Sequence, residues 1–280
     1  MKLMIKIFFA FVTILAISFY FLREPLLRST AAPAALEKVA ALPDEVSESS
    51  GIEVLPNGSG YLTHNDAGNK PYLYQLDKSG KLTKTIKLGL PNVDWEDLAR
   101  DDKGNIYIAD TGNNKNKRKE LAIYKVNPKD YTKAEAIRFS YEDQKDFPPA
   151  KQDMNFDCEA IFWHGGNLYL ISKDRGQKQT AKIYRVTAKA GKQQAKLIGS
   201  HKIPAAITGA AISPSGKEVV LISKEKLHIF QQVKNPEKFY DGKYKEVSLR
   251  GAGQTEAVAF ETDKMLVITS EGGNLYKYTL

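Results

Sequence analysis

The sequence contains one cysteine in 280 residues, and this scarcity limits the chemistry open to the chain. Cys158 has no second cysteine with which to form an internal disulfide, and a lone thiol argues against a thiolate metal site. Catalytic signatures are also lacking, since the sequence has no G-x-S-x-G, P-loop or H-E-x-x-H motif. The four histidines stand at unrelated places along the chain. The sequence therefore gives no sign of a nucleophilic triad or of a zinc centre.

Charge is not concentrated on any segment. The chain has 41 Lys and Arg against 33 Asp and Glu, and residues after position 30 retain an excess of about +5. The lysines are scattered, and the one basic run, residues 114–119, has the composition of a solvated loop. We expect no nucleic-acid partner.

Only the N-terminus has a long hydrophobic run. Residues 7–22 are uncharged and follow Lys2 and Lys6, a length between that of a signal-peptide core and that of a membrane span. We expect residues 1–22 to be a membrane anchor or signal segment, with a buried helix as the third alternative, and residues 23–35 to be a tether. No cysteine follows the run, which excludes a lipoprotein anchor. The anchor predicts a single-pass protein of the cell membrane with its remainder on the periplasmic or extracellular side.

A repeat fills the rest of the chain. Each copy has a short apolar strand, a turn rich in Gly, Asp and Asn, a second strand that ends near an acidic residue, and a third strand with an aromatic residue. The five copies are residues 48–76, 95–126, 158–186, 208–233 and 256–280. Fourth strands are expected at residues 82–88, 136–141, 195–203 and 244–249. The last copy lacks a fourth strand, which residues 36–42 can supply.

These features predict an all-β fold, a five-bladed β-propeller of four-stranded antiparallel blades over residues 36–280. The N-terminal strand closes the ring, and an N-terminal hydrophobic helix precedes it. We expect a monomer.

The repeat places one column of residues at the head of the first strand. The column consists of Ser50, Glu96, Glu159, Thr208 and Glu256. First strands line the axis of a propeller, so we expect these side chains to converge. Three carboxylates in a narrow channel repel one another unless a cation lies among them. Oxygen ligands without His or Cys suit Ca²⁺, so the column predicts an axial calcium site, with solvated glutamates as the alternative.

The chain also resembles a known family. The motifs "CEAIFW" (158–163), "TGAAIS" (208–213) and "TEAVAFETDKMLVITSEGGNLYKY" (255–278), together with the N-terminal anchor, resemble the SdiA-regulated family of membrane-anchored five-bladed propellers. The order Ser, Glu, Glu, Thr, Glu in the column resembles the Ser, Glu, Glu, Ser, Glu calcium ligands of calcium-dependent apyrases. Both resemblances imply a five-bladed ring, and the second implies that the column binds calcium.

A second set of polar residues follows the second strands. Loops after these strands open on the same face as the strand heads, so Asn65, Asp66, Asp110, Asp174 and Glu271 are candidates for a ligand site at the channel mouth. The alternative is that these residues shape tight turns, which Asp and Asn favour.

Three functions remain open on the sequence. The first is a tethered, non-catalytic binding propeller with calcium in its channel and a small molecule or protein partner at its mouth. The second is a calcium-dependent phosphohydrolase of the apyrase or phytase type, with Asp66 or Asp110 as general base and Lys70 or Lys117 holding phosphate. The third is a lactonase or esterase. We favour the first, because the loops show no base-plus-arginine constellation.

Overall fold

The computed structural model describes residues 36–280 of the chain. The predicted apolar helix of residues 1–22 and the tether of residues 23–35 lie outside this range. None of the helices found in residues 36–280 has the length and hydropathy that crossing a lipid bilayer requires.

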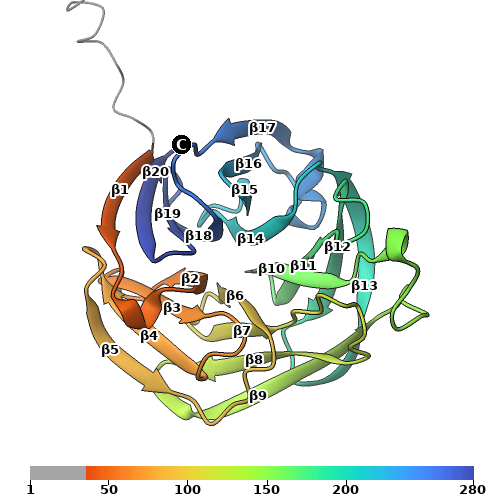
Figure 1. Cartoon of the computed structure of the whole chain (residues 1–280), viewed down its shortest axis with the longest axis horizontal. Helices are drawn as coiled ribbons and strands as arrows, with labels where there is room; N and C mark the ends of the chain where they lie inside the picture. The colour runs from red at the N-terminus through yellow and green to blue at the C-terminus, as the bar shows by residue number, and fades with distance from the viewer. Residues whose placement is uncertain (1–35) are drawn as a thin grey trace, which may run out of the picture. The chain divides into compact units, whose positions relative to one another are not determined.

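The described residues form an all-β fold whose sheets surround a common centre (Figure 1). Three short 3₁₀ turns are the helical segments of this range, η1 (Asp44–Val46), η2 (Lys151–Asp153) and η3 (Pro236–Asp241). Twenty strands make three four-stranded sheets and one eight-stranded sheet. The propeller architecture predicted from the repeat is confirmed.

Within each four-stranded sheet, neighbouring strands are antiparallel. One sheet comprises β2 (Ser49–Val54), β3 (Gly60–Asn65), β4 (Tyr72–Asp77) and β5 (Leu82–Lys87). Another comprises β14 (Ile207–Ile212), β15 (Glu218–Ser223), β16 (Lys226–Gln231) and β17 (Lys243–Ser248). Short turns connect most consecutive strands, whereas the segment between β16 and β17 contains η3.

The remaining four-stranded sheet joins the two ends of the described range. It comprises β18 (Thr255–Thr262), β19 (Met265–Ser270), β20 (Asn274–Thr279) and β1 (Leu36–Ala41). Strand β1 pairs antiparallel with β20, with Leu36 opposite Tyr278. The predicted closure by an N-terminal strand is therefore confirmed.

The eight-stranded sheet consists of two antiparallel groups of four. The first group comprises β6 (Trp95–Arg100), β7 (Ile106–Asp110), β8 (Leu121–Asn127) and β9 (Asp130–Tyr141). The second comprises β10 (Asp157–His164), β11 (Asn167–Lys173), β12 (Thr180–Thr187) and β13 (Gly191–Lys202). The outer strands β9 and β13 run parallel and pair from Ile137–Gly191 to Tyr141–Ala195. Both begin earlier than the sequence predicts, and their pairing was not predicted.

The first strands form the innermost layer. In ring order, β2 contacts β6, β6 contacts β10, β10 contacts β14, β14 contacts β18, and β18 contacts β2. Apolar side chains fill the spaces between successive sheets. Tyr107 and Ile123, for example, pack with Ile161 and Leu170 of the next group. Burial of this apolar area stabilises the ring, at about 25 cal/mol per Å² removed from water.

Each first strand has an irregularity at the same place. The register shifts between Ser49 and Gly51, Trp95 and Leu98, Cys158 and Ala160, Ile207 and Gly209, and Thr255 and Ala257. The column residues Ser50, Glu96, Glu159, Thr208 and Glu256 lie within these five shifts. A β-bulge leaves its extra residue unpaired and turns its side chain out of the regular alternation. The repeated bulge is thus the local feature that distinguishes the five column residues from the other residues of their strands.

Candidate metal and ligand site

The heads of the first strands surround an acidic pocket of about 220 Å³. Four of the five column residues line it, Ser50, Glu96, Glu159 and Glu256. The other residues that line it are Glu48, Asp66, Asn114, Lys173, Arg175, Gln254 and Glu271. The structure therefore brings the three predicted glutamates to one place.

Thr208 does not line this pocket. Its hydroxyl donates to the backbone oxygen of Thr255 at 3.0 Å, and so ties β14 to the neighbouring inner strand. Ser50 also donates across a strand boundary, to the backbone oxygen of Glu96 at 2.7 Å. The two hydroxyl residues of the column thus serve contacts between inner strands, and Ser50 lines the pocket as well.

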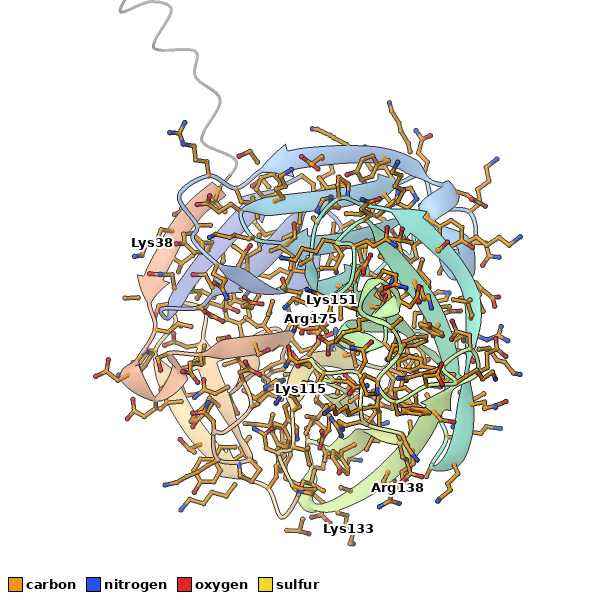
Figure 2. The ribbon with its side chains drawn as sticks, turned by 45° about the vertical axis from the view of Figure 1, so that its right-hand side comes forward. Lys38, Lys115, Lys133, Arg138, Lys151 and Arg175 are labelled. Atoms are coloured by element: carbon orange, nitrogen blue, oxygen red, sulfur yellow. The ribbon has the colours of Figure 1, made fainter. Side chains whose placement is uncertain are left out.

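Two cations at and after the end of β11 meet carboxylates of the neighbouring strand β10. Lys173, at the end of β11, donates to Oε2 of Glu159 at 2.7 Å. Arg175 donates through Nη2 to Oε1 of Glu159 and through Nε to Oδ2 of Asp157. Figure 2 shows Arg175 near the centre of the ring, whereas Lys133 and Arg138 lie at its edge. Asp157 and Glu159 therefore have cations of the chain itself as partners.

The burial of these pairs is deep. Glu159 and Asp157 are almost wholly inaccessible to solvent. Burial alone would lower the pKa of Lys173, but the Glu159 carboxylate raises that pKa above its usual value. The pKa of Arg175 is raised in the same way by Asp157 and Glu159. Both basic side chains thus remain charged in the pocket at neutral pH.

Glu96 is in a different situation. The residue is only 5% exposed, yet within residues 36–280 no hydrogen-bond donor meets its carboxylate. Burial raises the pKa of Glu96 well above its usual value, and Glu159, Asp157, Asp66 and Asp94 raise it further. An ionised Glu96 therefore has no hydrogen bond or ion pair from the described side chains, and Arg175 acts on it only by longer-range attraction.

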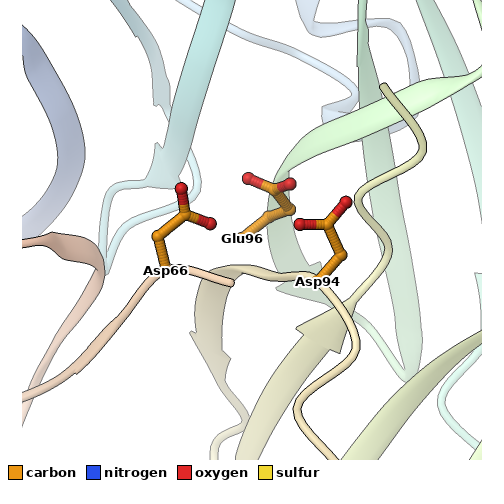
Figure 3. Close-up of side chains that lie close together, drawn as sticks. All are labelled: Asp66, Asp94 and Glu96. Atoms are coloured by element: carbon orange, nitrogen blue, oxygen red, sulfur yellow. The ribbon is translucent and has the colours of Figure 1, made fainter. Parts of the chain in front are cut away.

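Asp66 and Asp94 lie beside Glu96. One carboxylate oxygen from each of the three residues lies within 4.8 Å of the others, and Figure 3 shows Glu96 between the two aspartates. Burial raises the pKa of Asp94 to about 6, with contributions from Asp66, Asp157 and Asp110. Burial also raises the pKa of Asp66. A second group of close carboxylates consists of Glu96, Asp157 and Glu159. These buried acidic clusters could hold a metal ion.

Gly112 allows this close approach. A Cβ atom at this position would overlap Oε1 of Glu96 and the carboxylate of Asp94. The amide of Gly112 donates to the backbone oxygen of Asp94 at 3.0 Å, which fixes the two segments together. The absence of a side chain at residue 112 therefore leaves room for the carboxylates of Asp94 and Glu96.

Asp97 follows Glu96 in β6, and its side chain forms hydrogen bonds with three inner strands. Its carboxylate accepts the amide of Leu98 at 2.8 Å, that of Ile161 at 2.9 Å and that of Ala210 at 3.4 Å. The side chain has no solvent exposure, and burial raises its pKa well above the usual value although the three amides lower it. Asp97 is thus a structural group beneath the acidic pocket.

The residues predicted at the channel mouth divide into two groups. Asp66 and Glu271 line the pocket, whereas Asn65, Asp110 and Asp174 do not. The Asn65 amide donates to the backbone oxygen of Glu45. Asp110 accepts from Arg118 at 3.0 Å, and Asp174 accepts backbone amides of its own turn, which is the turn-forming role that the sequence also allows.

Several residues of the site escaped sequence reasoning. They are Glu48, Asp94, Asn114, Asp157, Lys173, Arg175 and Gln254. Register could have identified one of them, because Lys173 pairs with Asp157 across β10 and β11, two residues from Glu159. Asp94 directly precedes Trp95 and Glu96 and could be taken for a turn residue.

The fold has known structural relatives. A putative gluconolactonase structure has a TM-score of 0.51 and 13% identity, over 89% of this chain and 93% of that chain. The PQQ-bound aldose sugar dehydrogenase of Streptomyces coelicolor has a TM-score of 0.50 and 12% identity, over 89% and 100%. Virginiamycin B lyase of Staphylococcus aureus has a TM-score of 0.43 and 15% identity, over 85% and 68%. At these identities the likeness shows the β-propeller fold alone.

The sequence comparisons add no family. No protein-family profile matches the sequence, and no curated protein matches it. The comparisons support the propeller fold. They do not support the SdiA-regulated family in particular, and they give no evidence for calcium.

Proposed function

We propose that residues 36–280 form a five-bladed, non-catalytic binding propeller that holds a calcium ion in the acidic pocket and binds a small molecule or protein partner at the same mouth. Five groups of four strands, whose first strands contact one another in a closed cycle, support the count of five blades. The sequence motifs support membership of the SdiA-regulated type.

The observation that carries the proposal is the excess of carboxylates in the pocket. Six acidic residues line it, against two basic ones, Lys173 and Arg175. Both basic residues are engaged with Glu159 and Asp157. The remaining negative charge is partly buried and calls for a cation from outside the chain. Carboxylate and amide oxygens without His or Cys among them suit Ca²⁺ better than softer metals.

The same charges argue against the phosphohydrolase alternative. A phosphate group would enter a pocket with more carboxylates than cations. Lys70 and Lys117, the candidate phosphate-binding residues, do not line the pocket. Asp110, a candidate general base, is held by Arg118 at 3.0 Å. Asp66 remains in place but lacks a free arginine beside it, since Arg175 binds Asp157 and Glu159.

Location is part of the proposal and depends on the N-terminal sequence. We propose that residues 1–22 anchor the chain in the cell membrane and that the propeller lies on the periplasmic or extracellular side. The millimolar calcium available outside many cells would suit a site of modest affinity.

Calcium binding and phosphate release test the function together. The full chain, freed of metal with a chelator, is titrated with CaCl₂ and with MgCl₂ by calorimetry, and its thermal unfolding is recorded with and without calcium. Binding to the folded state stabilises by RT ln(1 + [L]/Kd), about 2.7 kcal/mol at a hundredfold excess over Kd. We expect calcium to raise the melting temperature, with no calcium-dependent phosphate release from nucleotides or phosphate esters.

A Glu159→Gln variant is measured beside the native protein. Phosphate release by the native protein that this variant loses would establish the hydrolase instead. Absence of any calcium effect on binding or melting would contradict the metal site.

A further inference from the structure

The carboxylates in and beside the pocket fall into two groups that differ in their partners. Asp157 and Glu159 are paired with Arg175 and Lys173. Within residues 36–280, the carboxylates of Asp66, Asp94 and Glu96 have no ion pair. Within the described residues the chain thus forms ion pairs on one side of the pocket and none on the other, where Arg118 acts on Asp94, and Lys173 and Arg175 act on Asp66, only by longer-range attraction.

Glu96 is the residue for which the missing partner matters most. A buried carboxylate ordinarily has hydrogen-bond donors or a cation beside it, because an uncompensated buried charge is costly. Glu96 is only 5% exposed and is aimed between two further carboxylates (Figure 3). No donor within residues 36–280 compensates it. This arrangement points to a ligand that carries positive charge.

The spacing of the three carboxylates identifies the kind of ligand. One oxygen from each lies within 4.8 Å of the others, a separation that one ion can bridge at the 2.3–2.6 Å distances typical of calcium. Gly112 leaves the space in which the carboxylates of Asp94 and Glu96 approach. Asn114 lines the same pocket and offers an amide oxygen.

We infer that the cation binds off the axis, to Asp66, Asp94 and Glu96, and that Lys173 and Arg175 take the place of a metal at the axial glutamate Glu159. This inference rests on the proposed calcium function, and it replaces the five-residue column as the ligand set. Glu96 alone is common to both sets. Glu256 and Thr208 are then not ligands.

Paired substitutions in the full chain test the ligand set, with CaCl₂ titrated by calorimetry. Asp94→Asn keeps the shape of the side chain and removes its charge, and we expect calcium affinity to fall roughly tenfold or more. Glu256→Gln is expected to change the affinity less than about threefold. Asp102→Asn, the same chemical change at an exposed turn residue, controls for loss of one charge anywhere on the surface.

Tb³⁺ provides a second readout. Trp95 is fully buried next to Glu96 and can sensitise the luminescence of a bound lanthanide. We expect excitation of tryptophan to give Tb³⁺ emission in the native chain, and Trp95→Phe to abolish most of it while calcium binding persists. Gly112→Ala should also weaken binding, although it removes no carboxylate. Circular dichroism shows whether each variant is folded, and Asp66→Asn replaces Asp94→Asn if the latter is not.

The outcomes separate the inference from the function on which it rests. If Glu256→Gln or Thr208→Val abolishes calcium binding while Asp94→Asn and Asp66→Asn leave it intact, the axial column is the site and the inference is wrong, but the proposed function stands. If the native chain binds neither Ca²⁺ nor Tb³⁺, the proposed function itself is wrong.

Discussion

Lys173 donates to Glu159 at 2.7 Å inside the acidic pocket, and this contact places a positive charge of the chain itself beside a buried carboxylate. Lys173 is 15% exposed at its side chain and Glu159 is 5% exposed, so the pair is largely desolvated. Breaking a buried pair leaves the partner charge uncompensated, which costs more than the pair itself contributes.

Replacement of this lysine should therefore affect stability and metal binding in opposite directions. We expect Lys173→Met to destabilise the calcium-free protein by about 2 kcal/mol, because Arg175 still meets Glu159. The same variant should bind calcium roughly threefold to tenfold more tightly, since a positive charge has left the pocket. Urea unfolding and calorimetric titration measure the two effects.

The exposed pair of Lys226 and Glu246 offers the matched control. Its donor and acceptor are 2.8 Å apart, but both side chains are well exposed. Lys226→Met should change stability by less than about 1 kcal/mol and leave calcium affinity unchanged. Equal effects of the two lysine variants would show that burial in the pocket is not the cause.

Asp97 is expected to be among the most sensitive positions of the ring. Asp97→Asn retains one acceptor oxygen and sets an amide NH₂ against backbone amides of Leu98, Ile161 or Ala210. Opposed donors in a buried site leave hydrogen bonds unmade, so we expect a loss of about 2–4 kcal/mol in the free energy of unfolding. Urea denaturation measures it.

Asp130→Asn is the control for this substitution. Asp130 also accepts a backbone amide, that of Thr132, but it lies at the start of β9 with its side chain 42% exposed, where water can take the place of the carboxylate. We expect this substitution to change the free energy of unfolding far less than Asp97→Asn does. A small effect at Asp97 would mean that the three amides it accepts are easily satisfied in another way.

The architecture could be predicted from the sequence because each copy of the repeat contains its own strand and turn signals. Turn residues and strand alternation recur in every copy, and the bulged residue of each first strand keeps a fixed place in it. For this reason Ser50, Glu96, Glu159 and Glu256 could be grouped by their position in the repeat. Closure by β1 followed from the missing fourth strand of the last copy.

The pairing of β9 with β13 left no such signal. It joins the outer strands of two groups that are far apart in the chain, and no turn connects the two strands to specify their register.

For a related reason, no local signal in the sequence indicated the internal cations of the pocket, and only strand register could have placed Lys173 there. A lysine at the end of a strand usually extends into solvent, and nothing local distinguishes Lys173 from the other scattered lysines of the chain. Its place follows from register with Asp157 and from the bulge that brings in Glu159. Asp94 also gave no local signal. Its carboxylate approaches Glu96 in a space that Gly112, just after β7, leaves open because it has no side chain.

Closure of the ring gives a prediction about association. Strand β1 covers the edge of β20, and an uncovered edge strand exposes unpaired backbone groups to other chains. A chain that begins at residue 43 should melt at a lower temperature and self-associate in size-exclusion chromatography. A chain that begins at residue 36 retains β1 and serves as control. A stable monomer from the shorter chain would show that the β1–β20 pairing is dispensable.

The pH dependence of stability should contain a contribution from His228. The ring is fully buried, with Nε2 3.0 Å from the hydroxyl of Ser223 and Nδ1 2.9 Å from that of Tyr244. Burial lowers its pKa to about 4, against the opposing effect of Glu246. The unfolded chain takes up a proton near pH 6.5 while the folded chain does not, so the stabilising contribution is complete above pH 6.5 and is lost as pH falls toward 4.

The difference between the native protein and His228→Gln isolates this group from the carboxylates that titrate in the same range. We expect the native protein to lose about 2 kcal/mol relative to the variant between pH 7 and pH 5. Urea unfolding at closely spaced pH values, in buffers of equal ionic strength, measures the difference. Parallel stability curves for the two proteins would mean that His228 binds a proton equally well in the folded and unfolded chain, and would contradict the burial that the structure gives it.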